Sequence, residues 1–210
     1  AEDVLVTVEN GVSVLELNRP KALNALNLNM VRLMQPVYEN NSRLYVLKSS
    51  NAQQKAFCAG GDIKDIYYTK NSQFFDEEYT LDYTIGTLDV PHVSILDGIT
   101  MGGGVGVSVH GSTRIATENT VFAMPETQIG FFCDVGGGHF LARLDNHWGM
   151  WLALTGSRLK GQQVAATGVA THFIPREKLP ELQQFLFAEA ANLTKKNVNS
   201  AIDSVFQQDR

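Results

Sequence analysis

The sequence is poor in the features that mark several common classes of protein. Its 210 residues contain no run of about 18 apolar residues, so no membrane-spanning helix is expected. Its two cysteines, Cys58 and Cys133, form no CxxC pattern, and we expect free thiols in a reducing compartment. The five histidines show no metal-ligand spacing, so no metal site is predicted. There is no Walker A lysine and no GxGxxG in register, which argues against P-loop and dinucleotide sites.

The net charge and the size of the chain exclude further classes of partner and limit the number of domains. The formal net charge is −5, and such mild acidity argues against a direct nucleic-acid site or an anionic membrane surface. A hydrophobic content of 44% suffices for one core of ordinary size with at most a small appendage. No targeting segment is visible at Ala1-Glu2-Asp3, so we expect any import signal to have been removed already.

Residue patterns predict a mixed α/β fold. Apolar and polar residues alternate over Val4–Glu9 and Val12–Leu17 across Asn10-Gly11, which predicts a β-hairpin. Asn27 is expected to cap a helix over Leu28–Tyr38. Farther along, a strand, a glycine turn and a helix recur at similar intervals. This recurrence predicts a repeated ββα unit with mostly parallel strands.

The second half of the chain has a helical pattern. A charged, aromatic helix is expected over Phe74–Leu88, and a strand over His92–Leu96 leads into the central glycine turn. After Gly136 we expect a series of helices, over 137–143, 147–155, 161–167 and 177–193.

Two glycine-rich turns are the first candidates for chemistry. The segment Met101–Gly106 leads into a predicted buried helix, where unpaired N–H groups and the helix dipole favour negative charge. Gly60-Gly61 forms a second turn after a strand. One N–H group from each turn, aimed at the same oxygen, would make an oxyanion hole. The alternative is close packing of helix on strand without a ligand, and the sequence alone does not bring the two turns together.

Two carboxylates surrounded by apolar residues are the second candidates. Glu126 and Asp134 lie in surroundings that shift a pKa, which suits acid–base or nucleophilic work. The alternatives are a first-turn helix residue for Glu126 and a cap of the next helix for Asp134. Glu77 and Glu78 belong to an acidic helix, where a solvated face is the favoured interpretation from the pattern alone.

Several motifs together resemble a known family. The chain is similar to the enoyl-CoA hydratase/isomerase (crotonase) superfamily from about Val4 to Pro175, and within it to the branch of 3-hydroxyisobutyryl-CoA hydrolases. The resemblance rests on these segments: Asn18–Leu26, Phe57–Asp62, Gly98–Gly106, Ser108–Gly111, Phe122–Thr127 and Ala170–Phe173.

The resemblance implies an architecture. We expect a crotonase-like (ClpP/crotonase) superhelix of stacked ββα turns with a helical C-terminal part. The core would cover 1–175, and 176–210 would begin a helical region. Because relatives continue farther and the segment Pro36–Leu44 is shorter than in the branch, we expect the chain to be truncated at Arg210 and to lack part of one loop.

The resemblance also implies roles for single residues. The thioester oxygen of an acyl-CoA is expected between the N–H groups of Gly61 and Gly103. The residue Glu126 matches the principal catalytic carboxylate of the branch, which acts as nucleophile or as base for water. Asp134 matches the residue that assists and contacts the substrate hydroxyl, and Glu78 matches a residue that lines the same site.

The coenzyme itself is expected to bind along Lys21, Leu23, Ala25 and the backbone of Ala59. It is part of the substrate, so the resemblance implies no separate cofactor and no metal ion.

The implied function is hydrolysis of a short branched hydroxyacyl-CoA, 3-hydroxyisobutyryl-CoA, in valine catabolism in the mitochondrial matrix. Hydratases of the superfamily carry a second catalytic glutamate where this chain has Gly106, so the glycine favours a thioesterase. One alternative is another enoyl-CoA hydratase/isomerase activity. The other is a hydrolase-like structural subunit of a large assembly, such as the small subunit of the mitochondrial ribosome. Partners other than the acyl-CoA would be copies of the chain in a homo-oligomer, or such an assembly.

Overall fold

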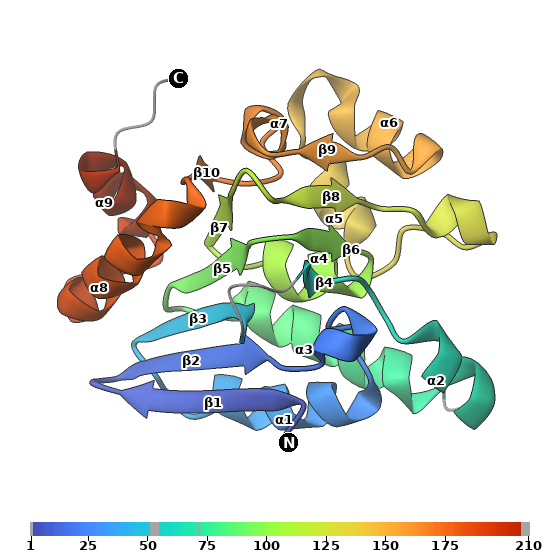
Figure 1. Cartoon of the computed structure of the whole chain (residues 1–210), viewed down its shortest axis with the longest axis horizontal. Helices are drawn as coiled ribbons and strands as arrows, with labels where there is room; N and C mark the ends of the chain where they lie inside the picture. The colour runs from blue at the N-terminus through green and yellow to red at the C-terminus, as the bar shows by residue number, and fades with distance from the viewer. Residues whose placement is uncertain (1, 51–54, 71, 207–210) are drawn as a thin grey trace.

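The computed structural model describes residues 2–50, 55–70 and 72–206, and contains a larger and a smaller sheet that lie side by side (Figure 1). The larger sheet has the strand order β1-β2-β3-β5-β7-β10. Its strands are β1 (Val4–Glu9), β2 (Val12–Leu17), β3 (Leu44–Ser49), β5 (His92–Leu96), β7 (Thr113–Ala116) and β10 (His172–Phe173). All neighbours are parallel except β1 and β2, which form the predicted hairpin.

The smaller sheet has the order β4-β6-β8-β9. Its strands are β4 (Ala56–Cys58), β6 (Ile99–Met101), β8 (Val121–Ala123) and β9 (Leu159–Lys160). The first three run parallel, and β9 is antiparallel to β8. Since β4 and β6 each lead into a glycine turn, this sheet brings the two turns to neighbouring positions.

Nine α-helices are found in the described part of the chain. They are α1 (Leu28–Tyr38), α2 (Ile63–Thr69), α3 (Gln73–Thr87), α4 (Gly103–Val109), α5 (Gly137–Leu141), α6 (Trp148–Thr155), α7 (Gln162–Ala166), α8 (Leu179–Glu189) and α9 (Val198–Val205). None of the described helices is long and apolar enough to cross a membrane.

The inner strand β3 of the larger sheet is covered on both faces, whereas the edge strand β1 is largely exposed. In β3, Tyr45 and Leu47 pack in a core that includes side chains of α1 and α3, whereas Leu44 and Val46 pack in a second core with α8 and α9. A parallel sheet needs such cover on both sides, which is why β3 is apolar at each position from Leu44 to Leu47. A third core joins α4 to β8 and to helices α5, α6 and α7.

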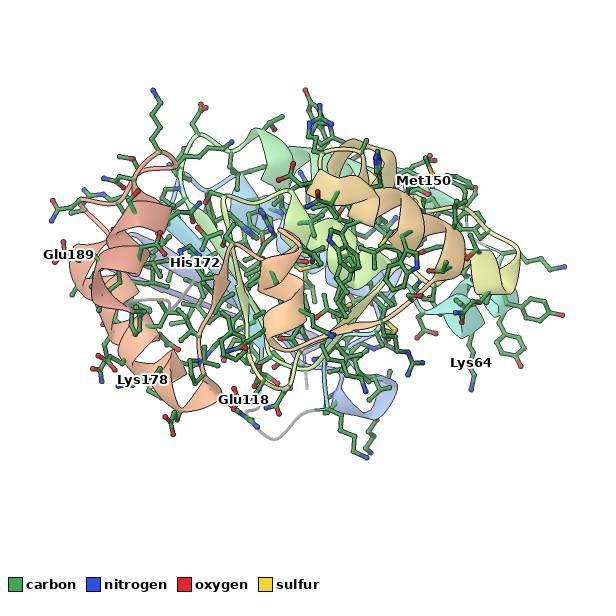
Figure 2. The ribbon with its side chains drawn as sticks, turned by 90° about the horizontal axis from the view of Figure 1, so that it is seen from above. Lys64, Glu118, Met150, His172, Lys178 and Glu189 are labelled. Carbon is green, nitrogen blue, oxygen red and sulfur yellow. The ribbon has the colours of Figure 1, made fainter. Side chains whose placement is uncertain are left out.

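Figures 1 and 2 place α8 at one end of the molecule and α2 at the other. In Figure 2 the labelled residue Glu189, the last of α8, lies at one end, and Lys64 of α2 lies at the other. Met150 of α6 lies at the surface near the α2 end and is 65% exposed.

The predicted elements agree with the structure where the sequence pattern is long. The hairpin strands and helix α1 have the predicted bounds, and the N–H of Met30 donates to Oδ1 of Asn27 at 2.8 Å, as expected for a cap. Helices α5, α6 and α7 lie within their predicted ranges.

Two expectations were wrong. The strand that leads into the central glycine turn is β6, not β5, because Gly98 (φ +117°) turns the chain from the larger sheet into the smaller one. A Cβ on Gly98 would lie 2.7 Å from the Lys55 carbonyl oxygen, so only glycine fits this turn. The predicted helix over 177–193 ends at Glu189, and a separate helix, α9, follows it.

Candidate active site

The two glycine turns meet. An ideal Cβ on Gly103 would lie 3.3 Å from the backbone nitrogen of Gly61, and one on Gly60 would lie 3.4 Å from the Met101 carbonyl oxygen. Gly103 is the first residue of α4, so its N–H group has no acceptor within the helix. Leu26 forms a parallel β-bridge with this turn: its N–H donates to the Gly60 carbonyl at 2.8 Å, and its carbonyl accepts from the Asp62 N–H at 2.7 Å. The Gly61 N–H takes no part in these two bonds. The structure thus brings together the two N–H groups expected to form an oxyanion hole.

The three central glycines, Gly102, Gly103 and Gly104, have different structural roles. A Cβ on Gly104 would collide with the Cys58 carbonyl group, so this glycine allows close packing of α4 on β4. A Cβ on Gly103 would instead collide with Oε1 of Glu78, and one on Gly102 would lie 3.0 Å from Oε1 of Glu126. Packing alone therefore explains Gly104, whereas Gly102 and Gly103 make room for carboxyl groups.

Glu126 is the first residue of a short 3-10 helix over Glu126–Ile129. Its side chain is buried, with 6% exposed, and Oε2 has no hydrogen-bond partner among the described residues. Burial raises the pKa of its carboxyl group, and the charge of Asp134 raises it further, against a lowering contribution from the Glu126 backbone and the Cys133 thiol. Such a carboxylate is a stronger base than an exposed one.

Asp134 is half-buried beside Glu126. Burial raises the pKa of its carboxyl group, and a hydrogen bond from the Tyr79 hydroxyl to Oδ2, at 2.6 Å, opposes that shift. The alternative role as a helix cap is wrong, because Gly136 is the cap residue of α5 and no side chain caps this helix. Tyr79 is not among the residues predicted from the sequence, and its one-turn offset from Phe75 in an aromatic helix was the available signal.

The prediction from the pattern that Glu78 lies on a solvated face of α3 was wrong. Only 2% of Glu78 is exposed, whereas its neighbour Glu77 faces outward and pairs with Arg32 at 2.6 Å. Burial, together with the charges of Asp134 and Glu126, raises the pKa of Glu78 to about 8. The pattern failed here because two adjacent residues on a helix differ by about 100° in direction, so one carboxylate points inward and the other outward.

A fourth carboxyl group was missed altogether. Asp82 lies one turn after Glu78 on α3, is 4% exposed, and has no hydrogen-bond partner for either oxygen among the described residues. Burial and the charges of Glu78 and Asp134 raise its pKa well above the ordinary value for aspartate. Its spacing of four from Glu78 is the signal that was available in the sequence.

The segment expected to bind coenzyme A borders the site. The backbone N–H of Ala59 donates to the Leu23 carbonyl at 3.1 Å, and Arg19 pairs with Asp62 at 3.0 Å. Lys21 lies in the 3-10 helix η1 (Pro20–Ala22) and is exposed. These contacts bring the predicted Lys21–Ala25 segment against the first glycine turn.

Elsewhere in the described structure, a metal-binding cluster or a second pocket with reactive groups would be a further candidate for chemistry. No group of three or more His, Cys, Asp or Glu side chains within residues 2–50, 55–70 and 72–206 is arranged to hold a metal ion. A groove of about 1100 Å³ lies between α7 and α9, with Ala166 and Phe206 among its lining residues, but it contains none of the predicted site residues.

Comparison with known proteins identifies the family. A model of the enoyl-CoA hydratase/isomerase family matches residues 12–210. Mitochondrial 3-hydroxyisobutyryl-CoA hydrolase of Xenopus tropicalis is 50% identical over 96% of this chain and 54% of its own length. The Homo sapiens protein of the same name is 47% identical over 97% of this chain and 55% of its own length. The chain thus spans about half the length of these curated relatives.

Solved structures agree. The crystal structure of a carnitinyl-CoA dehydratase from Mycobacterium thermoresistibile is 38% identical, with a TM-score of 0.84 over all of this chain and 68% of that one. An enoyl-CoA hydratase from Bacillus anthracis, 24% identical, shares the fold with a TM-score of 0.82 over 98% of this chain and 83% of that one. The predicted crotonase-type fold is therefore confirmed, and the chain belongs to the enoyl-CoA hydratase/isomerase family.

Proposed function

We propose that this chain carries the active site of a thioester hydrolase that converts 3-hydroxyisobutyryl-CoA and water into 3-hydroxyisobutyrate and CoA. The observation that carries the proposal is the convergence of Glu126, Asp134 and Glu78 on the junction of the two glycine turns. The hydrolase names of relatives that are 47% to 50% identical support the same choice of reaction and substrate.

The glycine turns would hold the thioester. Its carbonyl oxygen would accept hydrogen bonds from the N–H groups of Gly61 and Gly103, whose strength increases as the oxygen becomes negative in the tetrahedral intermediate. The start of α4 adds the favourable field of a helix N-terminus. Removing one such donor from an acyl-transfer site lowers kcat by about 10²–10³.

Glu126 would drive the attack on the carbonyl carbon. As a base it removes one proton from water while the hydroxide oxygen bonds to the carbonyl carbon. The intermediate then collapses, the C–S bond breaks, and the proton passes from Glu126 to the departing thiolate. As a nucleophile, a carboxylate oxygen of Glu126 would instead bond to the carbonyl carbon while the C–S bond breaks, which gives an anhydride and the CoA thiolate. Water then opens the anhydride at the Glu126 carbonyl, releases the product carboxylate and supplies the proton of the thiol. A single turnover in H₂¹⁸O distinguishes this route by labelling the carboxyl group of Glu126.

The remaining carboxyl groups would recognise the acyl part. Asp134, held by the Tyr79 hydroxyl, would accept a hydrogen bond from the substrate hydroxyl, and Glu78 would line the same pocket. Binding of coenzyme A along Lys21, Leu23, Ala25 and the Ala59 backbone completes the proposal.

The proposal extends to the compartment and the pathway. The curated relatives are named as mitochondrial, which supports a place in the mitochondrial matrix and in valine catabolism. These relatives bear enzyme names, so they favour the hydrolase over the ribosomal subunit considered from the sequence.

The test uses the full-length gene product and follows thiol release from 3-hydroxyisobutyryl-CoA together with hydration of crotonyl-CoA. We expect thiol release by the parent protein, and a loss of about 10³-fold in Glu126→Gln. Glu77→Gln is the matched control, because this neighbouring glutamate faces outward. Hydration of crotonyl-CoA without thiol release would replace the hydrolase by a hydratase.

A further inference from the structure

Asp82 is the one buried carboxyl group of the cluster that the proposed mechanism does not use. Both of its oxygens lack a hydrogen-bond partner among the described residues, although only 4% of the residue is exposed. A carboxylate in this situation is costly, because burial removes its water without supplying donors or a counter-charge. Its carboxyl group faces Gly106, one turn of α4 beyond the proposed oxyanion-hole residue Gly103, so we assign its part in the site to contact with a neighbouring side chain.

The backbone makes room for this side chain. An ideal Cβ on Gly106 would lie 2.6 Å from Oδ2 of Asp82, just as one on Gly103 would collide with Oε1 of Glu78. One turn of α3, from Glu78 to Asp82, thus faces one turn of α4, from Gly103 to Gly106. The two glycines leave two adjacent spaces: the Glu78 carboxyl group fills one, and the Asp82 carboxyl group and the Cβ of Val135 share the other.

The charges around Asp82 are all of one sign. Glu78 on its own helix and Asp134 on the loop before α5 are the charged groups whose fields act on it most strongly. The other titratable side chains near it are the hydroxyls of Tyr38, on α1, and Tyr79. No cation among the described residues pairs with Asp82. Under these conditions the neutral acid is favoured, and its O–H group is a hydrogen-bond donor.

A suitable acceptor lies one turn away. Oε1 of Glu78 is also buried and has no partner among the described residues. Side chains four residues apart on a helix are neighbours, so one hydrogen bond from Asp82 to Glu78 satisfies a buried oxygen of each.

We propose that Asp82 is a positioning residue that remains a neutral carboxylic acid and donates a hydrogen bond to Glu78, which fixes Glu78 beside Gly103. The cluster is then divided into an inner pair, Glu78 and Asp82, that carries protons and an outer pair, Glu126 and Asp134, that is ionised for catalysis. This separation of roles follows from the donors present. The Tyr79 hydroxyl donates to Asp134. Against the rise that burial causes, the Glu126 backbone and the Cys133 thiol lower the pKa of the Glu126 carboxyl group. Asp82 and Oε1 of Glu78, in contrast, have no donor among the described residues. The catalytic part of the inference rests on the proposed hydrolase function.

The first test compares Asp82→Asn with Asp82→Leu in the full-length gene product. Asparagine keeps a neutral donor, so we expect kcat within about threefold of the parent and an unchanged pH profile. Leucine keeps the volume but not the donor, so we expect kcat to fall about tenfold and the pH profile of kcat to shift, because Glu78 loses the hydrogen bond that fixes it. Asp76→Asn, an exposed change on the same helix, is the control. Equal losses in the asparagine and leucine variants would overturn the proposal, as would full activity of a folded leucine variant.

The second test needs no activity. Infrared difference spectra of the substrate-free parent and Asp82→Asn at neutral pH should contain the C=O stretch of a protonated carboxyl group, lost in the variant and shifted in D₂O. Absence of that band would overturn the proposal even if the enzyme is active. Presence of the band in a protein that releases no thiol would leave the neutral state of Asp82 intact and reject the proposed hydrolase instead.

Discussion

Asp97 and Asp82 are both buried aspartates, and their surroundings are opposite. Asp97, in the turn after β5, accepts hydrogen bonds from Thr117 at 2.7 Å and Asn119 at 3.1 Å, and pairs with Arg176 at 3.1 Å. Asp82 has no partner among the described residues and shares its space with other acids. The first carboxylate ties the sheet to the segment before α8. The second belongs to the proposed site, where we expect buried acids without counter-charges to lower the free energy of unfolding.

Among the substitutions that test this difference between structural and site carboxyl groups, Glu126→Gln should have the largest effect on kcat. The variant should lose about 10³-fold in kcat, while its free energy of unfolding stays equal or rises, because a buried acid with one unpartnered oxygen is replaced by a neutral amide. Thiol release and urea unfolding on the same samples check both parts. A variant that is less stable than the parent would mean that Glu126 supports the fold, unlike its neighbours in the cluster.

The two central glycines should separate activity from stability. Gly103→Ala would push a methyl group against Glu78 and should lower kcat by about 10²-fold. Gly104→Ala would push it against the Cys58 carbonyl and should destabilise the fold by about 1–3 kcal/mol. Kinetics and chemical denaturation of the two variants distinguish these results. Similar losses in both would argue that the whole turn serves packing alone.

Asp97→Ala tests the structural side of the comparison. It leaves Arg176 and Thr117 without their shared acceptor, so we expect a loss of about 3 kcal/mol in the free energy of unfolding. Asp82→Asn, measured in parallel by urea unfolding, should leave the free energy of unfolding unchanged. If both substitutions cost the same, the two aspartates would not differ in the way their surroundings suggest.

Titration of Glu78 should make the free energy of unfolding depend on pH. Its pKa is raised in the folded state from 4.5 to about 8, so its contribution to stability is fully present below 4.5 and is lost as the pH rises toward 8. Relative to Glu78→Gln, the parent should therefore lose stability across that interval. Unfolding midpoints at a series of pH values provide the measurement, and Glu77→Gln should behave as the parent does.

Tyr79→Phe gives the smallest expected effect. Removing the hydroxyl deletes the bond that lowers the pKa of Asp134, so the pKa rises and the acid limb of activity should move to higher pH. We expect kcat at neutral pH to fall about fivefold, the value of one hydrogen bond. An unchanged acid limb would show that Asp134 does not need this donor.

Much of the fold followed from local patterns. The Asn10-Gly11 hairpin and helix α1 have the predicted bounds, because alternation, a turn dipeptide and an Asn27 cap all agree there. The three-residue strand β6 was missed, since three residues show no period and the turn at Gly98 is set by contact with a distant carbonyl.

For the candidate site, the sequence by itself supplied the two glycine turns, the carboxyl groups of Glu126 and Asp134, and the resemblance that relates them to an acyl-CoA. The tertiary structure decided that the turns meet, that Glu78 points inward beside an outward Glu77, and that Asp82 occupies the space beside Gly106. These facts depend on how α3 packs against α4, a contact between residues distant in the chain. Residue patterns fix which face of a helix is apolar, but the meeting of two helices fixes which polar side chain lies at their junction.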